Sequence, residues 1–410
     1  MNVILYAVPF FFLLILIELL LEKNKGTDYY RVNDSINSLT AGVLSRMTGI
    51  VKQLLPLTIY VVAYEQLAMF QISSSWWMWV TAFVLYDFCY YWKHRFGHEM
   101  NILWAAHVVH HSSEEYNLTT ALRQSGSSFF SWIFYLPMAI LGFDPIMLIT
   151  VGSLNLIYQF WVHTRHIPKL GWYEWVFVTP SNHRVHHAQN QIYIDRNYGG
   201  VFILWDRLFG SFQEELDSDK PIYGIRKALK SWNPLWANVH VYVQLGKDCW
   251  HANRWQDKIF IWFKRTGWRP ADVEQNYPLS KVDLTQFRKF DVSLSLTNKC
   301  YSLIQYSLLV FVGLLLMINV SAFTLAEQVL VVVFVLYGSI SAGLVLENNP
   351  LAIHLEWIKY SLIMVTLVVY TLPVWIEWIL GASILINGLL LLLRKADIIT
   401  TTGPMVEASN

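Results

Sequence analysis

The chain has 410 residues, of which 55% are apolar, 16% aromatic and only 14% charged. An average soluble domain is ~25% charged, so we expect an all-α, polytopic integral membrane protein. The formal net charge of +1 supplies no strongly basic surface and excludes nucleic acid as a partner. Three widely spaced cysteines form neither a CxxC pair nor a disulfide framework, so any metal would be held by His, Asp or Glu.

Long apolar runs predict the membrane segments. The first run, 3–21, has no basic region before it and no small-residue cleavage site after it, which indicates a retained transmembrane helix. The polar linker 23–40 has the composition of an ordinary loop. Further runs lie at 48–70, 76–92, 129–163, 302–320, 326–346 and 358–393, the last divided near Pro373.

The run at 129–163 bears on the relative placement of the polar segments. As one helix its 35 residues would reach about 52 Å, too long for a single ~30 Å crossing. The sequence GFDP at 142–145 is typical of a turn. We therefore predict a hairpin that enters and returns, so that the segments before and after it meet on one side of the membrane.

A polar block at 164–300 follows the hairpin. It is rich in Trp, Lys and Arg, which favours a position at the headgroups on the cytoplasmic side. We therefore predict an N-terminal membrane region at 1–75, a catalytic domain at 76–300, a C-terminal transmembrane bundle at 301–394 and a tail at 395–410. The fold would be a transmembrane helical bundle with a cytoplasmic, histidine-rich di-metal cap domain.

Histidines gather in three short motifs. Five of the 13 histidines lie within residues 94–111, in HRFGH and HVVHH, and SNHRVHH follows at 181–187. Spacings of three and four residues place imidazoles on one face of a helix, and imidazole is the commonest metal ligand in proteins. The motifs predict eight ligands: His94, His98, His107, His110, His111, His183, His186 and His187.

The number of histidines bears on the number of metals. A single ion usually takes three or four protein ligands, so eight indicate two ions with about four imidazoles each. His163, where the hairpin returns, is a candidate ninth ligand, whereas His166, His240, His251 and His354 stand apart. Imidazole suits zinc, copper, iron and nickel alike. We favour redox-active iron, because activating O₂ against a lipid C–H bond is a fitting use of such a site at a membrane.

Other polar residues near the motifs are weaker candidates. Glu99 follows His98 and could orient a ligand or contact a cofactor. Asp87 lies seven residues before His94, hence on the same helical face but deeper, and buried acids at that depth are usually functional. Candidate substrate or cofactor contacts are Asn117, Arg123, Gln124 and Asp195.

The three motifs in this order, with a membrane hairpin between the second and third, resemble the fatty acid hydroxylase/sterol desaturase superfamily of membrane di-iron enzymes. The longer stretches WKHRFGHEMNILWAAHVVHHSSEEYNLTTALRQS, YQFWVHTRHI and TPSNHRVHHAQNQIYIDRNYGGVFILWDRLFGSF resemble the alkylglycerol monooxygenases, which cleave ether lipids. The resemblance is close over about residues 70–270. The first and last membrane segments match only in kind.

The resemblance implies two iron ions held by the eight motif histidines and His163, and insertion of oxygen from O₂ next to an ether oxygen. It implies a lipid substrate from the bilayer and a role for Glu99 in pterin use. No fused cytochrome b5-like or flavin domain is visible. Electrons would therefore come from tetrahydrobiopterin or another soluble reductant, or from a separate electron-transfer protein.

Two alternatives remain at this point. A sterol or fatty-acyl hydroxylase or desaturase would use the same metals with another donor and substrate. A metal-binding membrane transporter would place ionisable residues deep in several spans, whereas these histidines gather at helix ends. The expected location is a bacterial inner membrane or the endoplasmic reticulum, with the active site facing the cytoplasm.

Overall fold

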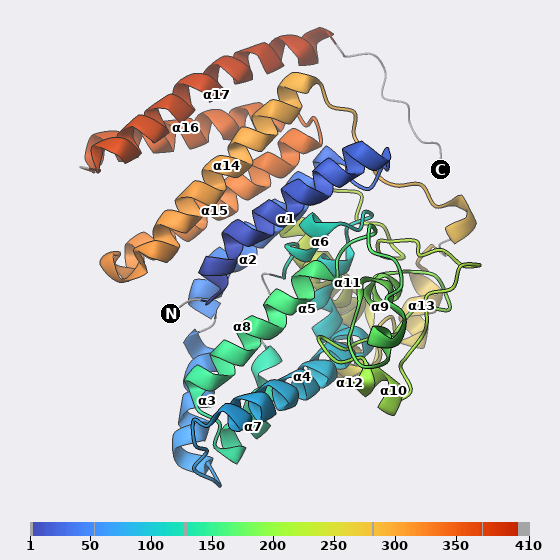
Figure 1. The fold of residues 1–410 in the computed structure, drawn as a ribbon. Helices are drawn as coiled ribbons and strands as arrows, with labels where there is room; N and C mark the ends of the chain where they lie inside the picture. Colours follow the sequence, from blue (N-terminus) through green and yellow to red (C-terminus); the bar gives the residue numbers. More distant parts are fainter. Residues whose placement is uncertain (1–2, 53, 126–129, 281–282, 371, 401–410) are drawn as a thin grey trace. The chain divides into compact units, whose positions relative to one another are not determined.

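The computed structural model describes residues 3–52, 54–125, 130–280, 283–370 and 372–400 (Figure 1). Over these ranges the chain is helical, and β-structure is limited to two isolated bridges, Phe177 with Phe202 and Ala188 with Tyr223. The predicted all-α class is confirmed. Contacts divide the chain into a first unit, Met1–Leu229 with Ala237–Lys289, and a second, Lys230–Trp236 with Phe290–Asn410. This division falls before the boundary predicted at residue 300.

The first unit is built around α4, which packs against α5, α8 and η1. In Figure 1, α4 and α8 run side by side. α11 begins in the short segment assigned to the second unit and continues into the first. The helices up to residue 289 are α1 Val3–Lys25, α2 Val32–Lys52, α3 Leu54–Leu67, α4 Trp76–Glu99, α5 Asn101–His111, α6 Leu118–Ala121, η1 Phe130–Tyr135, α7 Leu136–Leu141, α8 Pro145–Trp161, η2 Gly171–Trp175, α9 Pro180–His186, α10 Leu204–Leu208, α11 Pro234–His251, α12 Trp255–Phe263, α13 Ala271–Asn276 and η3 Leu284–Gln286.

The linker predicted as a loop at 23–40 is partly helical, which corrects that expectation. α2 begins at Val32, and the Asp34 and Asn37 side chains are buried. Ser113 donates to Asp34 Oδ1 at 2.6 Å, and Arg123 donates to Asn37. The polar residues of this segment therefore face polar partners inside the protein rather than water, a difference that composition does not reveal.

The hairpin predicted at 129–163 has its turn at the expected place; its first residue lies outside the described residues. The arms are the short apolar segment Phe130–Leu141 and α8. Gly142 joins them with φ +95°, and a Cβ there would lie 1.9 Å from the Phe70 carbonyl oxygen. Asp144 then caps α8 by accepting the Ile146 backbone N–H at 2.7 Å. α8 returns the chain, and His163 follows directly after the helix ends.

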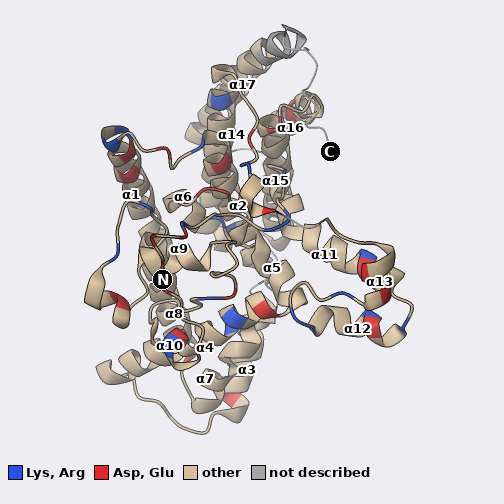
Figure 2. Ribbon diagram, turned by 90° about the vertical axis from the view of Figure 1, so that its right-hand side faces the viewer, with Lys and Arg blue, Asp and Glu red and all other residues tan. Residues whose placement is uncertain are grey.

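The second unit contains α14 Leu296–Ile318, η4 Val320–Ala322, α15 Leu325–Leu346, α16 Leu351–Val369 and α17 Val374–Thr400. Among the described residues, four segments are long and apolar enough to cross a membrane: Leu296–Ile318, Leu325–Leu346, Leu351–Val369 and Val374–Leu393. The predicted break near Pro373 is confirmed. α17 runs to Thr400, past the end predicted at 394. Charged residues are sparse along these four helices and frequent on α12 and α13 (Figure 2).

One charged pair is nevertheless buried in this unit. Glu356 and Lys359 lie on α16, with Lys359 Nζ 2.6 Å from Glu356 Oε2. Lys359 also donates to Gln305 Oε1 at 2.5 Å, and Ser341 donates to Glu356 Oε1 at 2.5 Å. Tyr301 donates to the same carboxylate. The network ties α16 to α14 and α15.

Candidate metal centre

The nine predicted histidines come from four places in the first unit. α4 carries His94 and His98, α5 carries three, the segment after α8 carries one, and the end of α9 carries three. They form a five-histidine group and a four-histidine group, and within each group the candidate ligand atoms lie within 4.8 Å of one another. The five-histidine group contains His94, His98, His107, His111 and His186. The four-histidine group contains His110, His163, His183 and His187.

Each HxxHH triplet contributes to both groups. His107 and His111 join the five-histidine group, and His110 between them joins the other. The reason is helical geometry, because residues i and i+4 lie about 40° apart around the axis while i+3 and i+4 lie about 100° apart. The α9 triplet divides in the opposite sense, so α5 and α9 together flank both groups. The rings of His111 and His187 stack with centroids 4.3 Å apart.

Backbone carbonyls fix which ring nitrogen carries the proton. Nδ1 lies 2.8 Å from the carbonyl oxygen of Tyr198 for His94, and 2.9 Å from that of Arg123 for His110. A carbonyl oxygen only accepts, so Nδ1 must donate and Nε2 is left with a bare lone pair. His163 and His186 are held in the same way, by Gln159 and Arg196. This is the usual second layer around a metal-binding imidazole.

The resulting lone pairs face one another, which tests whether the site fits a cation. His110 and His163 both donate through Nδ1, yet their Nε2 atoms lie 3.4 Å apart. Two unprotonated nitrogens cannot hydrogen bond and repel each other unless a cation lies between them. His186 Nε2 and His98 Nε2 are buried, and neither has a hydrogen-bond partner among the described residues. The donor set therefore fits a bound metal ion.

The spacing of the nitrogens agrees with metal coordination. A metal about 2.1 Å from two imidazole nitrogens would hold them about 3.0 Å apart at a right angle and about 3.4 Å apart at a tetrahedral angle. His94 and His107 Nε2 are 3.1 Å apart, and His107 and His111 Nε2 are 3.2 Å apart. In the four-histidine group His183 Nε2 lies 3.1 Å from His163 Nε2.

Burial keeps the imidazoles neutral. It lowers the pKa of His110 to about 4 and that of His186 to about 3. Burial and neighbouring histidines lower the pKa of His98, His107 and His187 well below the usual range. A neutral imidazole is the form that binds metal, so the site is ready for ligation near pH 7.

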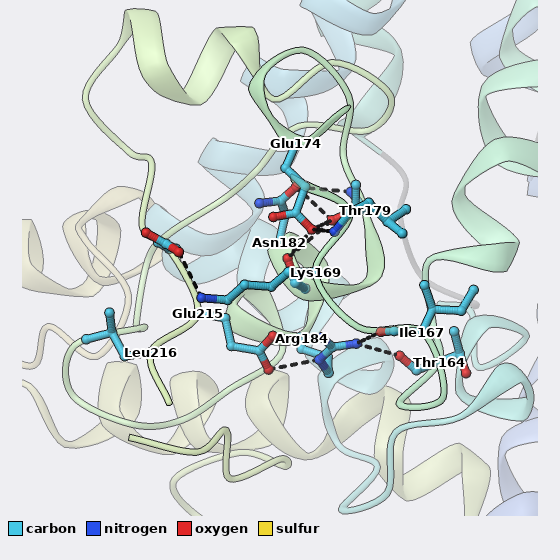
Figure 3. A network of polar contacts seen from close by, with 12 residues as sticks. Thr164, Ile167, Lys169, Glu174, Thr179, Asn182, Arg184, Glu215 and Leu216 are labelled. Atoms are coloured by element: carbon cyan, nitrogen blue, oxygen red, sulfur yellow. Dashed lines mark hydrogen bonds and ion pairs between the residues drawn. The ribbon is translucent and has the colours of Figure 1, made fainter. Parts of the chain in front are cut away.

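A polar network orients α9 (Figure 3). Arg184 pairs with both carboxylate oxygens of Glu215 at 2.8 and 2.7 Å, and its Nη1 donates to the carbonyls of Thr164 and Ile167. At the start of the helix, Asn182 Oδ1 accepts the backbone N–H of Thr179 at 3.1 Å. These contacts fix the rotation of a helix of seven residues, and with it the direction of its histidines.

Arg123 and Asn117 lie behind the histidines. Arg123 is buried and donates to the Val109 carbonyl at 2.8 Å and the Ser112 hydroxyl at 3.1 Å. Asn117 caps α6 by accepting the Thr119 N–H at 3.0 Å. Neither lines the cavity described below. Their contacts indicate support of α5 and α6 rather than contact with substrate.

Asp87 acts at a distance from the imidazoles. Its carboxylate accepts from the backbone N–H groups of Val201 and Phe202 at 2.8 and 3.0 Å, and from Trp205 Nε1 and Asn155 Nδ2 at 3.0 and 2.7 Å. Tyr198, whose carbonyl accepts from His94, lies just before Val201 in the chain, and its own N–H donates to Asp206 Oδ1 at 2.7 Å. The carboxylate thus orients a candidate ligand through the backbone.

Glu99, Asp195 and Gln124 lie at the edge of the site. Glu99 pairs with Arg95 at 3.1 Å and accepts from the Tyr198 hydroxyl at 3.2 Å. Asp195 pairs with the exposed Arg265 at 3.1 Å and does not line the cavity. Gln124 lines the cavity and donates to the Ala121 carbonyl at 2.9 Å.

A cavity of about 190 Å³ opens beside both groups. His94 and His107 of one group and His110 and His163 of the other reach its wall. The rest is mostly apolar, and includes Phe11, Leu103, Phe130, Phe134, Leu156 and Phe160. The cavity could hold an apolar chain against both groups at once.

Some site residues were not predicted. Arg46, Lys93 and Gln159 line the cavity, and the carbonyls of Tyr198 and Arg196 orient imidazoles. Lys93 directly precedes His94 in the sequence, and this adjacency is a signal for its place in the site. The other four carry no sequence signal, because they reach the site through folding of distant segments.

Comparison with known proteins places the chain in a family. The fatty acid hydroxylase family matches residues 79–211, which include all nine histidines. The human alkylglycerol monooxygenase is 36% identical over 357 residues, covering 86% of this chain and 80% of the human protein. The enzyme of the same name from Danio rerio is 37% identical over 363 residues, covering 87% and 80%. No solved structure matches. With this identity over most of both sequences, the chain belongs to the alkylglycerol monooxygenase family and carries a fatty acid hydroxylase domain.

Proposed function

We propose that the protein is a membrane di-iron monooxygenase that hydroxylates the carbon next to the ether oxygen of an alkylglycerol. The observation that carries the proposal is the pair of histidine groups, nine imidazoles in all, both of which reach the wall of one mostly apolar cavity. The alkylglycerol is inferred from the printed activity of the similar proteins.

The two groups would each hold one iron ion. The iron pair would supply activation of O₂, with one oxygen atom inserted into the C–H bond and the other leaving as water. This requires two electrons and two protons from an external reductant. The hydroxylated ether is a hemiacetal, which breaks down to an aldehyde and a free glycerol hydroxyl.

The protein itself would orient the imidazoles and exclude water from the cavity. The carbonyls of Tyr198, Arg123, Gln159 and Arg196 hold the imidazoles in the tautomer that presents Nε2. Apolar side chains such as Phe134 and Phe160 exclude water that would compete with substrate. The carbon that reacts would be the one on the alkyl chain of the substrate that lies where both histidine groups reach the cavity wall.

We also propose that tetrahydrobiopterin is the reductant. The alternative source of electrons is a separate electron-transfer protein. Glu99 is a suitable contact for it, because its carboxylate is partly exposed beside Tyr198, whose ring lies 5.5 Å from that of His98. We place the polar segments on the cytoplasmic side of the bacterial inner membrane or the endoplasmic reticulum, where a soluble reductant is available.

A sterol or fatty-acyl hydroxylase remains a second candidate, because the matching domain family is that of fatty acid hydroxylases. Full-length protein in mild detergent should be assayed with matched C16 chains, one an alkylglycerol and one a free fatty acid, together with a sterol. Two irons per chain and aldehyde formed only from the alkylglycerol, with reduced pterin and O₂, would support the proposal. Hydroxylation of the fatty acid or sterol instead would favour the second candidate. Zinc in place of iron would contradict both.

A further inference from the structure

The cavity beside the histidines contains positive charge with no acid to balance it. Arg46 of α2 and Lys93 of α4 line it, and among the described residues that line it none is Asp or Glu. Within the described residues Arg46 has no hydrogen bond or ion pair. Lys93 contacts the ring of Tyr90, with Nζ 5.2 Å from the centroid, and no carboxylate in the described part of the chain pairs with it.

Such an arrangement is unfavourable without an anion. A guanidinium stays charged at any physiological pH, and removing a charge from water is costly unless it is paired. The remaining polar residues of the wall, such as Gln124 and Gln159, are neutral. A ligand that brought a negative group would lower this cost and gain two charge-assisted contacts.

The position of the cations suggests which part of a lipid they meet. Lys93 adjoins His94, and the cavity that both cations line also reaches His110 and His163. In an ether lipid the carbon next to the ether oxygen is separated from the far glycerol substituent by only the short glycerol backbone. A group near these cations is therefore a headgroup, while the chain follows the apolar wall.

We propose that Arg46 and Lys93 bind a phosphate carried by a single-chain ether lipid, and that the cavity prefers a 1-O-alkylglycerol 3-phosphate to a neutral alkylglycerol. The inference rests on the proposed function. Phosphate fits better than carboxylate, since two cations match a group of charge about −1.5 to −2. Arginine also pairs with two phosphate oxygens at once.

Equilibrium binding tests this without turnover. Full-length protein in mild detergent is titrated with hexadecylglycerol 3-phosphate and with hexadecylglycerol, monitored by tryptophan fluorescence. We expect the phosphate lipid to bind at least ten-fold more tightly to the wild type. Arg46→Gln should weaken its binding at least ten-fold and change that of the neutral lipid by less than two-fold. Arg46→Lys should keep most of the preference, and exposed Arg226→Gln all of it.

Lys93→Gln provides a second variant should Arg46→Gln fail to fold, and it should also lose the preference. Equal affinity of the wild type for both lipids, or equal weakening of both by Arg46→Gln, would overturn the inference. Inorganic phosphate that binds as tightly as the phosphate lipid would assign the cations to a free anion and overturn it too. Aldehyde from neutral alkylglycerol without any phosphate preference would contradict only this inference. Phosphate preference in a protein without iron or turnover would contradict only the proposed function.

Discussion

The two units each bury a polar cluster, and the clusters differ in whether their members satisfy one another. In the second unit the ammonium of Lys359 has three acceptors, two of them on Glu356, and the buried tyrosine hydroxyls point to the same carboxylate. In the first unit the Nε2 atoms of His110 and His163 face each other with no proton between them. The first arrangement is complete in itself, and the second is completed only by a cation. Burial of polar groups therefore indicates a site only where their hydrogen bonding is left open.

The largest effect should come from removing one ligand from either group. If each group holds one iron ion, as proposed, His98→Ala and His183→Ala should each reduce iron from two per chain to about one. Each should also lower aldehyde formation by more than the 10–100-fold typical of second-layer changes. Iron is measured by elemental analysis on purified protein. Exposed His354→Ala is the control and should keep both ions. Wild-type iron content in His183→Ala would show that the four-histidine group holds no metal.

Breaking the hydrogen-bond network around Glu356 and Lys359, the closed network of the second unit, should lower the free energy of unfolding and leave the metal content unchanged. Lys359→Met leaves the Glu356 carboxylate buried without its cation, which should cost about 3–5 kcal/mol of the free energy of unfolding. The double variant Glu356→Leu with Lys359→Met should recover most of this loss. Thermal unfolding in detergent measures both, with iron per chain determined in parallel. Loss of iron in Lys359→Met would mean that the two clusters are not independent.

Asp87→Asn should weaken the metal centre without touching a ligand. The amide would place an N–H₂ group among the donors of Val201, Phe202 and Trp205. The segment that orients His94 would then shift, and iron affinity should fall about 10–100-fold. Excess iron should restore activity in this variant. A variant whose iron content and iron affinity equal those of the wild type would remove Asp87 from the site.

The smallest structural effect is expected for Glu99→Gln. Its pair with Arg95 is partly exposed, and i,i+4 pairs of this kind contribute about 0.3–0.5 kcal/mol. Iron content and unfolding temperature should therefore be close to wild type. If Glu99 contacts the reductant, KM for tetrahydrobiopterin should rise several-fold while KM for the lipid stays constant. Unchanged KM for both would leave Glu99 with only its surface role.

Local spacing made much of the site predictable. The HxxHH motifs place their histidines on helices, and a turn at GFDP returns the chain so that His163 joins the others. The motifs do not predict that His107 and His110 belong to different groups, because their spacing alone places the three histidines of a triplet on one helical face. The carbonyl partners at Tyr198 and Arg196 depend on tertiary packing and leave no pattern in the sequence.

The sequence was less informative about helices whose polar residues are buried. Residues 32–40 looked like a loop because Asp34 and Asn37 are hydrophilic, yet both lie inside. Glu356 and Lys359 carry no sequence signal for the opposite reason, because the apolar run at 358–393 begins after Glu356 and contains Lys359 as an isolated charge among apolar residues. Their partners on α14 and α15 are far away in the sequence, and only the fold brings them together.

The closed network of the second unit has a consequence for synthesis of the protein. A helix with a glutamate and a lysine enters a bilayer at considerable cost when it is alone. The chain is made from its N-terminus, so Tyr301, Gln305 and Ser341 are translated before Glu356 and Lys359. By the time α16 leaves the ribosome, the residues that receive its charges can already be in the membrane. Because α14 and α15 precede α16 in the chain, the polar partners of Glu356 and Lys359 are made before the two charged residues that need them.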